Sequence, residues 1–219
     1  MKENDQTTYE RLMRSAVKLF AQKGFDGTTT REIVADARSS LSSLQAHFQS
    51  KEMLHQAVIA RTIQTFYKLN VPIIDEVNEA EAQGILTPNM AWNLIVELTS
   101  QMVEWAFHEE YRDEILVINR EIMSPDKIYQ DLPEQLYGPF NCYNKLFEVY
   151  TGQKDQFWIK ALVFSTVTAI VGIVNYPRVM SHALDCDMDL PENRKKLKMH
   201  MKNYLLTSIQ AMLRERGIE

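Results

Sequence analysis

The chain has 219 residues, of which 45% are hydrophobic and 24% charged, so it is neither disordered by composition nor too short for one large or two modest domains. Its 24 Lys or Arg and 29 Asp or Glu give a net charge of −5, which argues against a protein that coats nucleic acid with a uniformly basic surface. Only seven Gly and seven Pro occur and strand-like alternation is scarce, so an all-α fold is expected.

Near the amino end, the sequence has the pattern of short helices with marked ends. Apolar side chains from Tyr9 to Phe20 fall on one face of a first helix, and Gly24 stands where such a helix ends. Thr29 and Glu32 have the T-x-x-E spacing of a capping box, which predicts the start of a second helix.

A third and a fourth helix follow at once. Ser40 is an N-cap candidate for a helix over residues 41–48, and Ser50 is one for a helix from Lys51 to about Leu69. Small polar residues on the outer face of the third helix predict a helix-turn-helix, a shape that fits the DNA major groove. Short capped helices also occur in all-α proteins that do not bind DNA, so periodicity alone leaves both readings open.

After Pro72, which is expected to end or kink the fourth helix, the chain becomes apolar at helical spacing. Helices are predicted over parts of residues 90–106, 115–123, 136–150, 157–174 and 192–213. The segment 157–174 is apolar on every side, and a helix of that kind must be buried on every side. We therefore expect a homodimer that forms through helices at about 157–176 and 192–213.

The region from Gly24 to Leu54 resembles the N-terminal domain of the TetR family of bacterial transcriptional regulators. The positions that match are Phe20, Gly24, Phe25, Thr28, Thr29, Arg31, Ile33, Ala37, Ser40, Leu44, His47, Phe48, Lys51 and Leu54. The resemblance implies a helix-turn-helix DNA-binding domain over residues 1–52 and a larger helical effector-binding and dimerisation domain over residues 53–219. It also implies a double-stranded DNA operator and a small-molecule effector as partners.

Four positions depart from the family pattern. The family usually has Gly and then an apolar residue where this chain has Arg38 and Ser39, Gly where it has Ser42, and Tyr where it has Gln45. The family Gly serves a backbone position of positive φ, where Arg costs on the order of 1 kcal/mol. We hypothesise that Arg38 offsets this cost in function by adding a contact to a DNA phosphate.

The candidate DNA-binding residues combine short polar side chains with cations. Gln45 suits an adenine edge, Ser43 suits a phosphate or a base, and Lys51 lies at a helix N-terminus that favours an anion. The full predicted set is Thr29, Arg38, Ser40, Ser42, Ser43, Gln45, His47 and Lys51.

The candidate effector site consists of aromatic, methionine and aliphatic side chains with a few polar groups among them, a composition that suits an apolar pocket with orienting hydrogen bonds. Plain hydrophobic core explains the same residues equally well, taken one at a time. The predicted set is Met102, Trp105, His108, Ile118, Asn119, Met123, Phe140, Tyr143, Phe147, Phe164 and Thr168.

Other chemistry has little support in the sequence. No H-E-x-x-H, G-x-S-x-G or phosphate-binding loop occurs, so no metal site, cofactor or catalytic activity is expected. Cys142 and Cys186 are expected to be reduced thiols, and no apolar run reaches the ~20 residues of a membrane span. With no signal peptide recognised either, we expect a cytoplasmic location.

The sequence thus predicts a ligand-responsive regulator that binds a palindromic operator. The expected role is that of a repressor, which a small, largely apolar effector releases from the operator. Arg38, Ser39 and Gln45 motivate an alternative, in which the fold binds small molecules but has weakened or lost operator recognition. A helical enzyme that uses the same pocket is the third reading, and the missing catalytic constellation argues against it.

Overall fold

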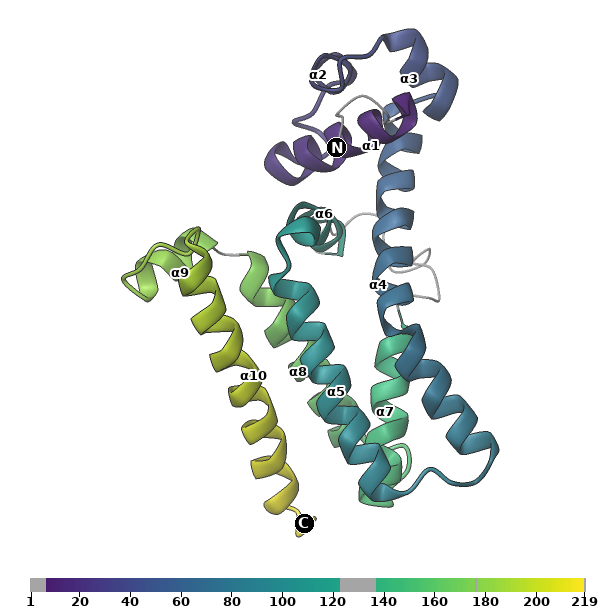
Figure 1. Cartoon of the computed structure of the whole chain (residues 1–219), viewed down its shortest axis with the longest axis vertical. Helices are drawn as coiled ribbons and strands as arrows, with labels where there is room; N and C mark the ends of the chain where they lie inside the picture. Colours follow the sequence, from purple (N-terminus) through teal and green to yellow (C-terminus); the bar gives the residue numbers. More distant parts are fainter. Residues whose placement is uncertain (1–6, 123–136, 176, 219) are drawn as a thin grey trace. The chain divides into compact units, whose positions relative to one another are not determined.

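The computed structural model describes residues 7–122, 137–175 and 177–218, and every element within these ranges is helical, which confirms the all-α prediction (Figure 1). The elements are α1 (Thr8–Lys23), α2 (Thr30–Asp36), α3 (Leu41–Phe48), α4 (Lys51–Ala82), α5 (Pro88–Phe107), a short 3-10 helix η1 (Glu109–Tyr111), α6 (Arg112–Ile122), α7 (Gly138–Thr151), α8 (Phe157–Asn175), α9 (Pro177–Ala183) and α10 (Pro191–Arg214).

The chain divides into two compact units, and the division falls inside α4. Unit 1 consists of Met1–Thr65 and Glu110–Leu132, and unit 2 of Phe66–Glu109 and Pro133–Glu219. Unit 1 therefore combines the amino-terminal helices and the first turns of α4 with α6, which follows much later in the sequence. Whether residues 1–52 fold as a domain of their own stays a prediction.

The core of unit 1 is apolar and draws on five helices. Leu12 and Phe20 of α1, Ile33 of α2 and Leu44 of α3 are almost wholly buried together. Leu54 and Val58 of α4 and Val117 of α6 belong to the same cluster, and α1 contacts α2, α3 and α6 directly.

The helix ends in unit 1 lie where the capping signals predict them. The Thr29 hydroxyl accepts the Glu32 amide while the Glu32 carboxylate accepts the Thr29 amide, so the capping box is complete. The Ser40 hydroxyl accepts the Ser43 amide, and the Ser50 hydroxyl accepts the Met53 amide. These caps satisfy backbone donors that a helix start leaves unpaired.

The fourth helix is longer than the sequence predicts. It continues past Leu69 and carries Pro72 in its interior, where a proline removes one backbone hydrogen bond. The carbonyl that loses its partner is that of Lys68, and the neighbouring Leu69 carbonyl accepts a hydrogen bond from the Gln101 side-chain amide of α5. Of the two alternatives expected at Pro72, an end of the helix is therefore wrong, and a kink within a longer helix stays a prediction.

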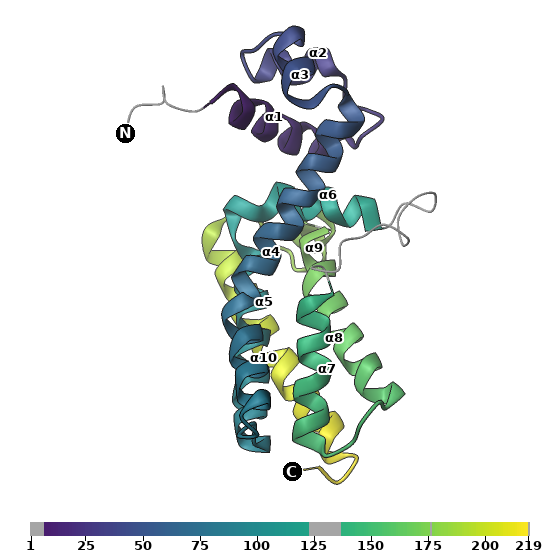
Figure 2. The ribbon, with the colours of Figure 1, turned by 90° about the vertical axis from the view of Figure 1, so that its right-hand side faces the viewer.

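In unit 2, α5 is the central helix, and it contacts α7, α8 and α10 (Figures 1 and 2). Its buried side includes Leu98 and Thr99, and the Thr99 hydroxyl accepts a 2.7 Å hydrogen bond from the buried Tyr143 hydroxyl of α7. Cys142 is a buried free thiol, and Cys186 is also free. Among the helices that the structure describes, none is both long and apolar enough to cross a membrane.

Ser39, in the turn between α2 and α3, has a buried hydroxyl oxygen without a hydrogen-bond partner. Such an oxygen costs about 1–3 kcal/mol relative to hydration. Ser39→Ala is therefore expected to raise the free energy of unfolding by about 1 kcal/mol in urea denaturation of the full chain. Ser40→Ala is the matched control and should lower it by about 1 kcal/mol through loss of an N-cap. A loss of stability in Ser39→Ala would contradict this account of the turn.

Candidate nucleic-acid interface

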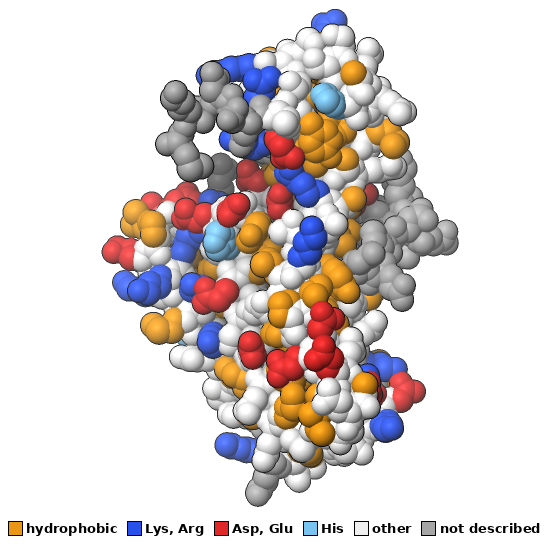
Figure 3. All heavy atoms as spheres, turned by 45° about the vertical axis from the view of Figure 1, so that its right-hand side comes forward, with side chains coloured by type: hydrophobic (Ala, Val, Ile, Leu, Met, Phe, Trp, Pro, Cys, Tyr) orange, Lys and Arg blue, Asp and Glu red, His pale blue; other side chains and the backbone are white. Residues whose placement is uncertain are grey.

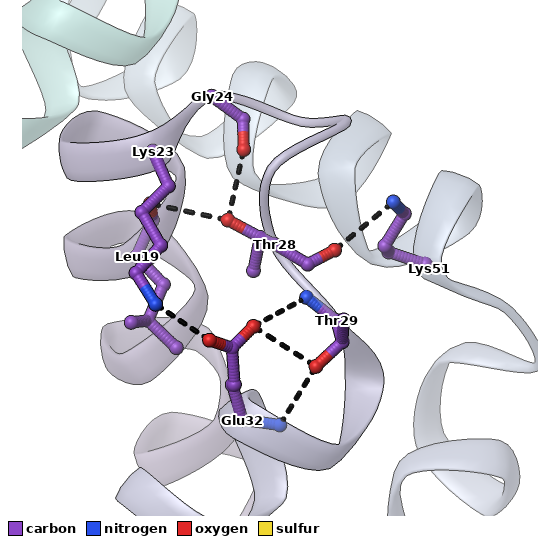
Figure 4. A network of polar contacts seen from close by, with 7 residues as sticks. All are labelled: Leu19, Lys23, Gly24, Thr28, Thr29, Glu32 and Lys51. Atoms are coloured by element: carbon purple, nitrogen blue, oxygen red, sulfur yellow. Dashed lines mark hydrogen bonds and ion pairs between the residues drawn. The ribbon is translucent and has the colours of Figure 1, made fainter.

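The loop before α2 is held by a network of polar contacts (Figure 4). The Thr28 hydroxyl donates to the carbonyls of Gly24 at 2.8 Å and Leu19 at 3.2 Å, which ties the loop to the end of α1. The Lys23 ammonium lies 2.5 Å from the Glu32 carboxylate, so the capping residue of α2 also pairs with α1. The first turn of α2 is thus fixed to α1 from two sides.

Two carboxylates of α2 have lowered pKa values. The hydrogen bond from Lys23, followed by those from Thr29, lowers the pKa of Glu32 to about 2. The hydrogen bond from Lys18, followed by that from Ser15, lowers the pKa of Asp36 from its ordinary 3.8. Both groups therefore favour the folded state when they are ionised.

The stability of unit 1 should consequently decrease in acid. Because the pKa values of Glu32 and Asp36 are lower in the folded state, their contribution is complete above the ordinary 4.5 of Glu32 and is lost as the pH falls towards about 2. Melting temperatures measured across this range should fall less steeply for Glu32→Gln than for the parent chain. Titration of the Glu32 carboxyl near 4.5 in an NMR experiment would refute the expectation.

The outer face of α3 carries short or uncharged side chains. Ser42, Gln45, Ala46 and His47 are exposed, and Ser43 is half-buried. The Ser40 hydroxyl lies 2.9 Å from the hydroxyls of both Ser42 and Ser43, which groups three small polar side chains at the start of the helix. The short side chains of this face suit a major groove, and contact of Gln45 with a base edge stays a prediction.

Lys51 has a second role besides the predicted one. Its ammonium donates to the carbonyls of Phe25 at 2.9 Å and Thr28 at 3.1 Å, and it lies 4.0 Å from the centre of the Phe25 ring. These two carbonyls take two of the three donors of an ammonium. Lys51 therefore fastens the loop before α2 to the start of α4, and contact with a phosphate stays a prediction.

Arg38 has a φ of 48°, so the turn keeps the positive-φ geometry that glycine usually serves. Arg38→Gly is expected to raise the free energy of unfolding by about 1 kcal/mol through relief of this strain. If Arg38 contacts a phosphate, the same change should weaken DNA binding and reduce the salt slope by about 0.9. Arg38→Lys keeps both the strain and the charge and is the control. An unchanged salt slope in Arg38→Gly would exclude the phosphate contact.

Comparison with known proteins identifies this architecture. The family model described as "Bacterial regulatory proteins, tetR family" matches residues 12–58, which run from α1 into α4. Residues 12–58 are thus a TetR-family amino-terminal domain. The helix-turn-helix predicted from the caps is thus the DNA-binding motif of that family.

Two relatives from Bacillus subtilis (strain 168) extend the comparison. The Probable HTH-type transcriptional regulator YttP is 27% identical over 124 residues, which are 54% of this chain and 56% of that protein. The Uncharacterized HTH-type transcriptional regulator YerO is 42% identical over 45 residues, which are 20% of this chain and 16% of that protein. The chain thus matches about half the length of YttP and a smaller part of YerO.

Solved structures show the same fold over a larger part of the chain. AibR, in complex with isovaleryl coenzyme A and operator DNA, matches with a TM-score of 0.55 at 17% identity. The matched region covers 77% of this chain and 86% of the AibR chain. A tetR-family protein from Rhodococcus RHA1 matches with a TM-score of 0.54 at 18% identity, over 90% of this chain and 97% of that protein's chain.

Two residues that the predicted DNA-binding set does not contain lie beside members of that set. Leu41, which helical spacing placed with the core residues Leu44 and Phe48, is 42% exposed at the first position of α3. Tyr9 stacks on Phe48 and meets the His47 ring edge-on at 6.0 Å. An apolar side chain at a groove-facing position suits a thymine methyl group, so Leu41 joins the candidate set.

The charge distribution is consistent with DNA contact through the amino-terminal helices. Residues 1–52 carry eight Lys or Arg and seven Asp or Glu, whereas the rest carries 16 and 22. In the second half of α4, Asp75, Glu76 and Glu79 are exposed, and Figure 3 shows acidic side chains gathered on the face that it presents. This part of unit 2 repels phosphates.

The predicted effector-binding residues are not all brought together. Met102, Trp105, Tyr143 and Phe147 are buried in unit 2, where Phe140 is half-buried and His108 is exposed at the end of α5. Ile118 and Asn119 are buried on α6, which belongs to unit 1. Phe164 and Thr168 are exposed on α8, and Met123 lies outside the described residues. In the part of the chain that the structure describes, no three His, Cys, Asp or Glu side chains group to hold a metal.

Proposed function

We propose that this chain is a homodimeric, effector-responsive regulator of transcription that binds a pseudo-palindromic operator through α3. The observation that carries the proposal is the exposed polar face of α3 on a fully capped helix-turn-helix, within the segment that matches the TetR family. Two copies would place their α3 helices in successive major grooves, with centres ~34–36 Å apart.

The exposed apolar residues of α8 and α10 support the homodimer. Phe157 and Phe164 of α8 are 84% and 62% exposed, and Met199 and Tyr204 of α10 are 62% and 56% exposed. The two helices contact each other within the chain. A soluble protein covers an apolar surface of this kind with a partner, and the same surface on a second copy gives a closed two-fold contact.

Release by an effector is the finer part of the proposal. The buried aromatic side chains Trp105, Tyr143 and Phe147 of unit 2 provide an apolar environment for a small guest. AibR, which has a similar fold, is described with both isovaleryl coenzyme A and operator DNA. An effector would release the operator if it bound more tightly to a conformation of unit 2 in which the two α3 helices of the dimer are not spaced for successive major grooves. Repression would then be relieved.

The test is a gel shift with the DNA that flanks the gene, together with selection of binding sequences from genomic fragments. We expect a retarded complex, a palindromic consensus, and an affinity that falls with salt. Gln45→Ala should cost about 1–3 kcal/mol and relax the preference at one base position, whereas Gln22→Ala, an exposed change on α1, should not. Recovery of no consensus would favour the alternative of a small-molecule binder without an operator.

A further inference from the structure

Four polar atoms in unit 2 are buried and lack a hydrogen-bond partner. Among the described residues, these atoms are the Asn70 and Asn144 Oδ1, the Gln101 Oε1 and the Trp105 Nε1. Native proteins pair nearly all of their buried polar atoms, so a group of unpaired ones needs an explanation. One explanation is that the missing partner is a ligand.

Three of the four atoms belong to side chains that meet one turn of α4. Gln101 and Trp105 are four residues apart and therefore lie on the same face of α5. The Gln101 amide donates to the Leu69 carbonyl, and the Trp105 ring packs on the Phe66 ring with centroids 4.6 Å apart. The Asn70 amide donates to the Phe66 carbonyl at 2.7 Å. The turn Phe66–Asn70 thus connects all three.

The orientation of both amides follows from their partners. A backbone carbonyl only accepts hydrogen bonds, so the NH2 groups of Asn70 and Gln101 must face Phe66 and Leu69. The amide oxygens are then the free ends, and the indole N–H of Trp105 is a free donor. Asn70 is 2% exposed and Trp105 is 9% exposed, so bulk water does not satisfy them.

We propose that this turn is the anchor for the polar end of the effector, and that the effector is an uncharged molecule with adjacent N–H or O–H donors and a carbonyl acceptor, such as an amide or a urea. Its donors pair with the oxygens of Asn70 and Gln101, and its carbonyl accepts from Trp105. None of the buried residues that the structure describes is charged, so an ionised guest would lack a counter-charge here. The rings of Phe66 and Trp105 suit a flat, apolar remainder.

The position on α4 connects the anchor to the helix-turn-helix of unit 1, an inference that rests on the proposed function. Phe66 is the first residue of unit 2 along a helix that begins at Lys51 in unit 1. A guest that pairs with the turn Phe66–Asn70 therefore acts on the helix that carries α3. The shift that it causes in the conformational equilibrium of unit 2 is set by the difference between its binding free energies for the two conformations.

Phenylurea is the probe, because it has urea N–H donors, a carbonyl and a flat apolar ring. The full chain is labelled with nitrogen-15, and the Trp105 indole signal is assigned by its loss in Trp105→Phe. We expect a saturable downfield shift of that signal with phenylurea, and no comparable shift with toluene or benzoate. Equal responses to all three compounds, or none to phenylurea, would overturn the proposal, and ordered water would then be the partner of these atoms.

Variants distinguish a role of Asn70 in effector binding from a role in the stability of the fold. Asn70→Leu should weaken phenylurea binding at least tenfold. Its melting temperature should stay close to that of the parent chain, because removal of an unpaired buried oxygen offsets the lost hydrogen bond to the Phe66 carbonyl. Asn78→Leu, an exposed change on the same helix, should leave binding unchanged. If Asn70→Leu fails to fold, Trp105→Phe serves instead, with binding followed by the backbone amides of α4 and α5 and the same tenfold loss expected. Wild-type affinity in the folded variant would refute the anchor.

Failure of this proposal is distinguishable from failure of the proposed function. Probe binding is measured without DNA, and DNA binding is measured without the probe. Loss of the operator complex alone would refute the regulator, and absence of the indole shift alone would refute the anchor.

Discussion

Replacing Phe164 with glutamate is expected to convert the proposed dimer into monomers. Phe164 is 62% exposed on α8, and in a two-fold contact each substitution counts twice. Burial of a Phe side chain contributes about 1.5–3 kcal/mol, and two unpaired carboxylates at the contact add a further cost. We expect a loss of roughly 4 kcal/mol or more, which corresponds to a dissociation constant raised about a thousandfold.

Analytical ultracentrifugation across a dilution series measures this change, and a gel shift on the same samples should show loss of the two-site complex. Ile85→Glu is the control, because Ile85 is 55% exposed in the connection between α4 and α5, outside the two helices. A Phe164→Glu protein that stays dimeric at concentrations where the parent chain does would place the dimer contact elsewhere.

Lys51→Ala should lower the free energy of unfolding by about 2–3 kcal/mol. The substitution removes two charge-assisted hydrogen bonds, to Phe25 and Thr28, and the contact of the ammonium with the Phe25 ring. It also unfastens the loop before α2 from α4, so DNA affinity should fall together with stability. Urea denaturation gives the first effect, and titration of the operator at low temperature gives the second.

Salt dependence separates the two roles of Lys51. A phosphate contact should reduce the salt slope by about 0.9 in Lys51→Ala, whereas a purely structural role should leave the slope unchanged for the folded fraction. Lys18→Ala is the control for stability, because its exposed pair with Asp36 contributes at most about 1 kcal/mol. Equal stability of Lys51→Ala and Lys18→Ala would show that the two carbonyls find other partners.

Local signals made the helix-turn-helix predictable. The hydroxyls of Thr29, Ser40 and Ser50 cap helices through contacts that span three residues, so they can be read from spacing alone. Gly24 and Gly152 end their helices at positive φ, which is a property of single residues. Three of these positions, Gly24, Thr29 and Ser40, also carry the TetR resemblance.

Local spacing could not predict the features that depend on contacts between residues far apart in the sequence. The hydrogen bond from Gln101 to Leu69 joins α5 to α4, and the inward orientation of Lys51 depends on the carbonyls of Phe25 and Thr28. The short α9, which begins at Pro177, was not predicted from spacing. The effector site was predicted from apolar composition, which also describes plain core. The unpaired atoms of Asn70 and Gln101 become visible only in three dimensions.

The packing of α6 against α1 restricts how such a protein can be recombined. Val117 of α6 is buried in the same cluster as Leu12 and Phe20 of α1, although about a hundred residues separate them. A chimera that took its amino-terminal 65 residues from another regulator would pair a foreign α1 with the native α6. Successful transplants of operator specificity should therefore carry both segments, or graft only the exposed side chains of α3.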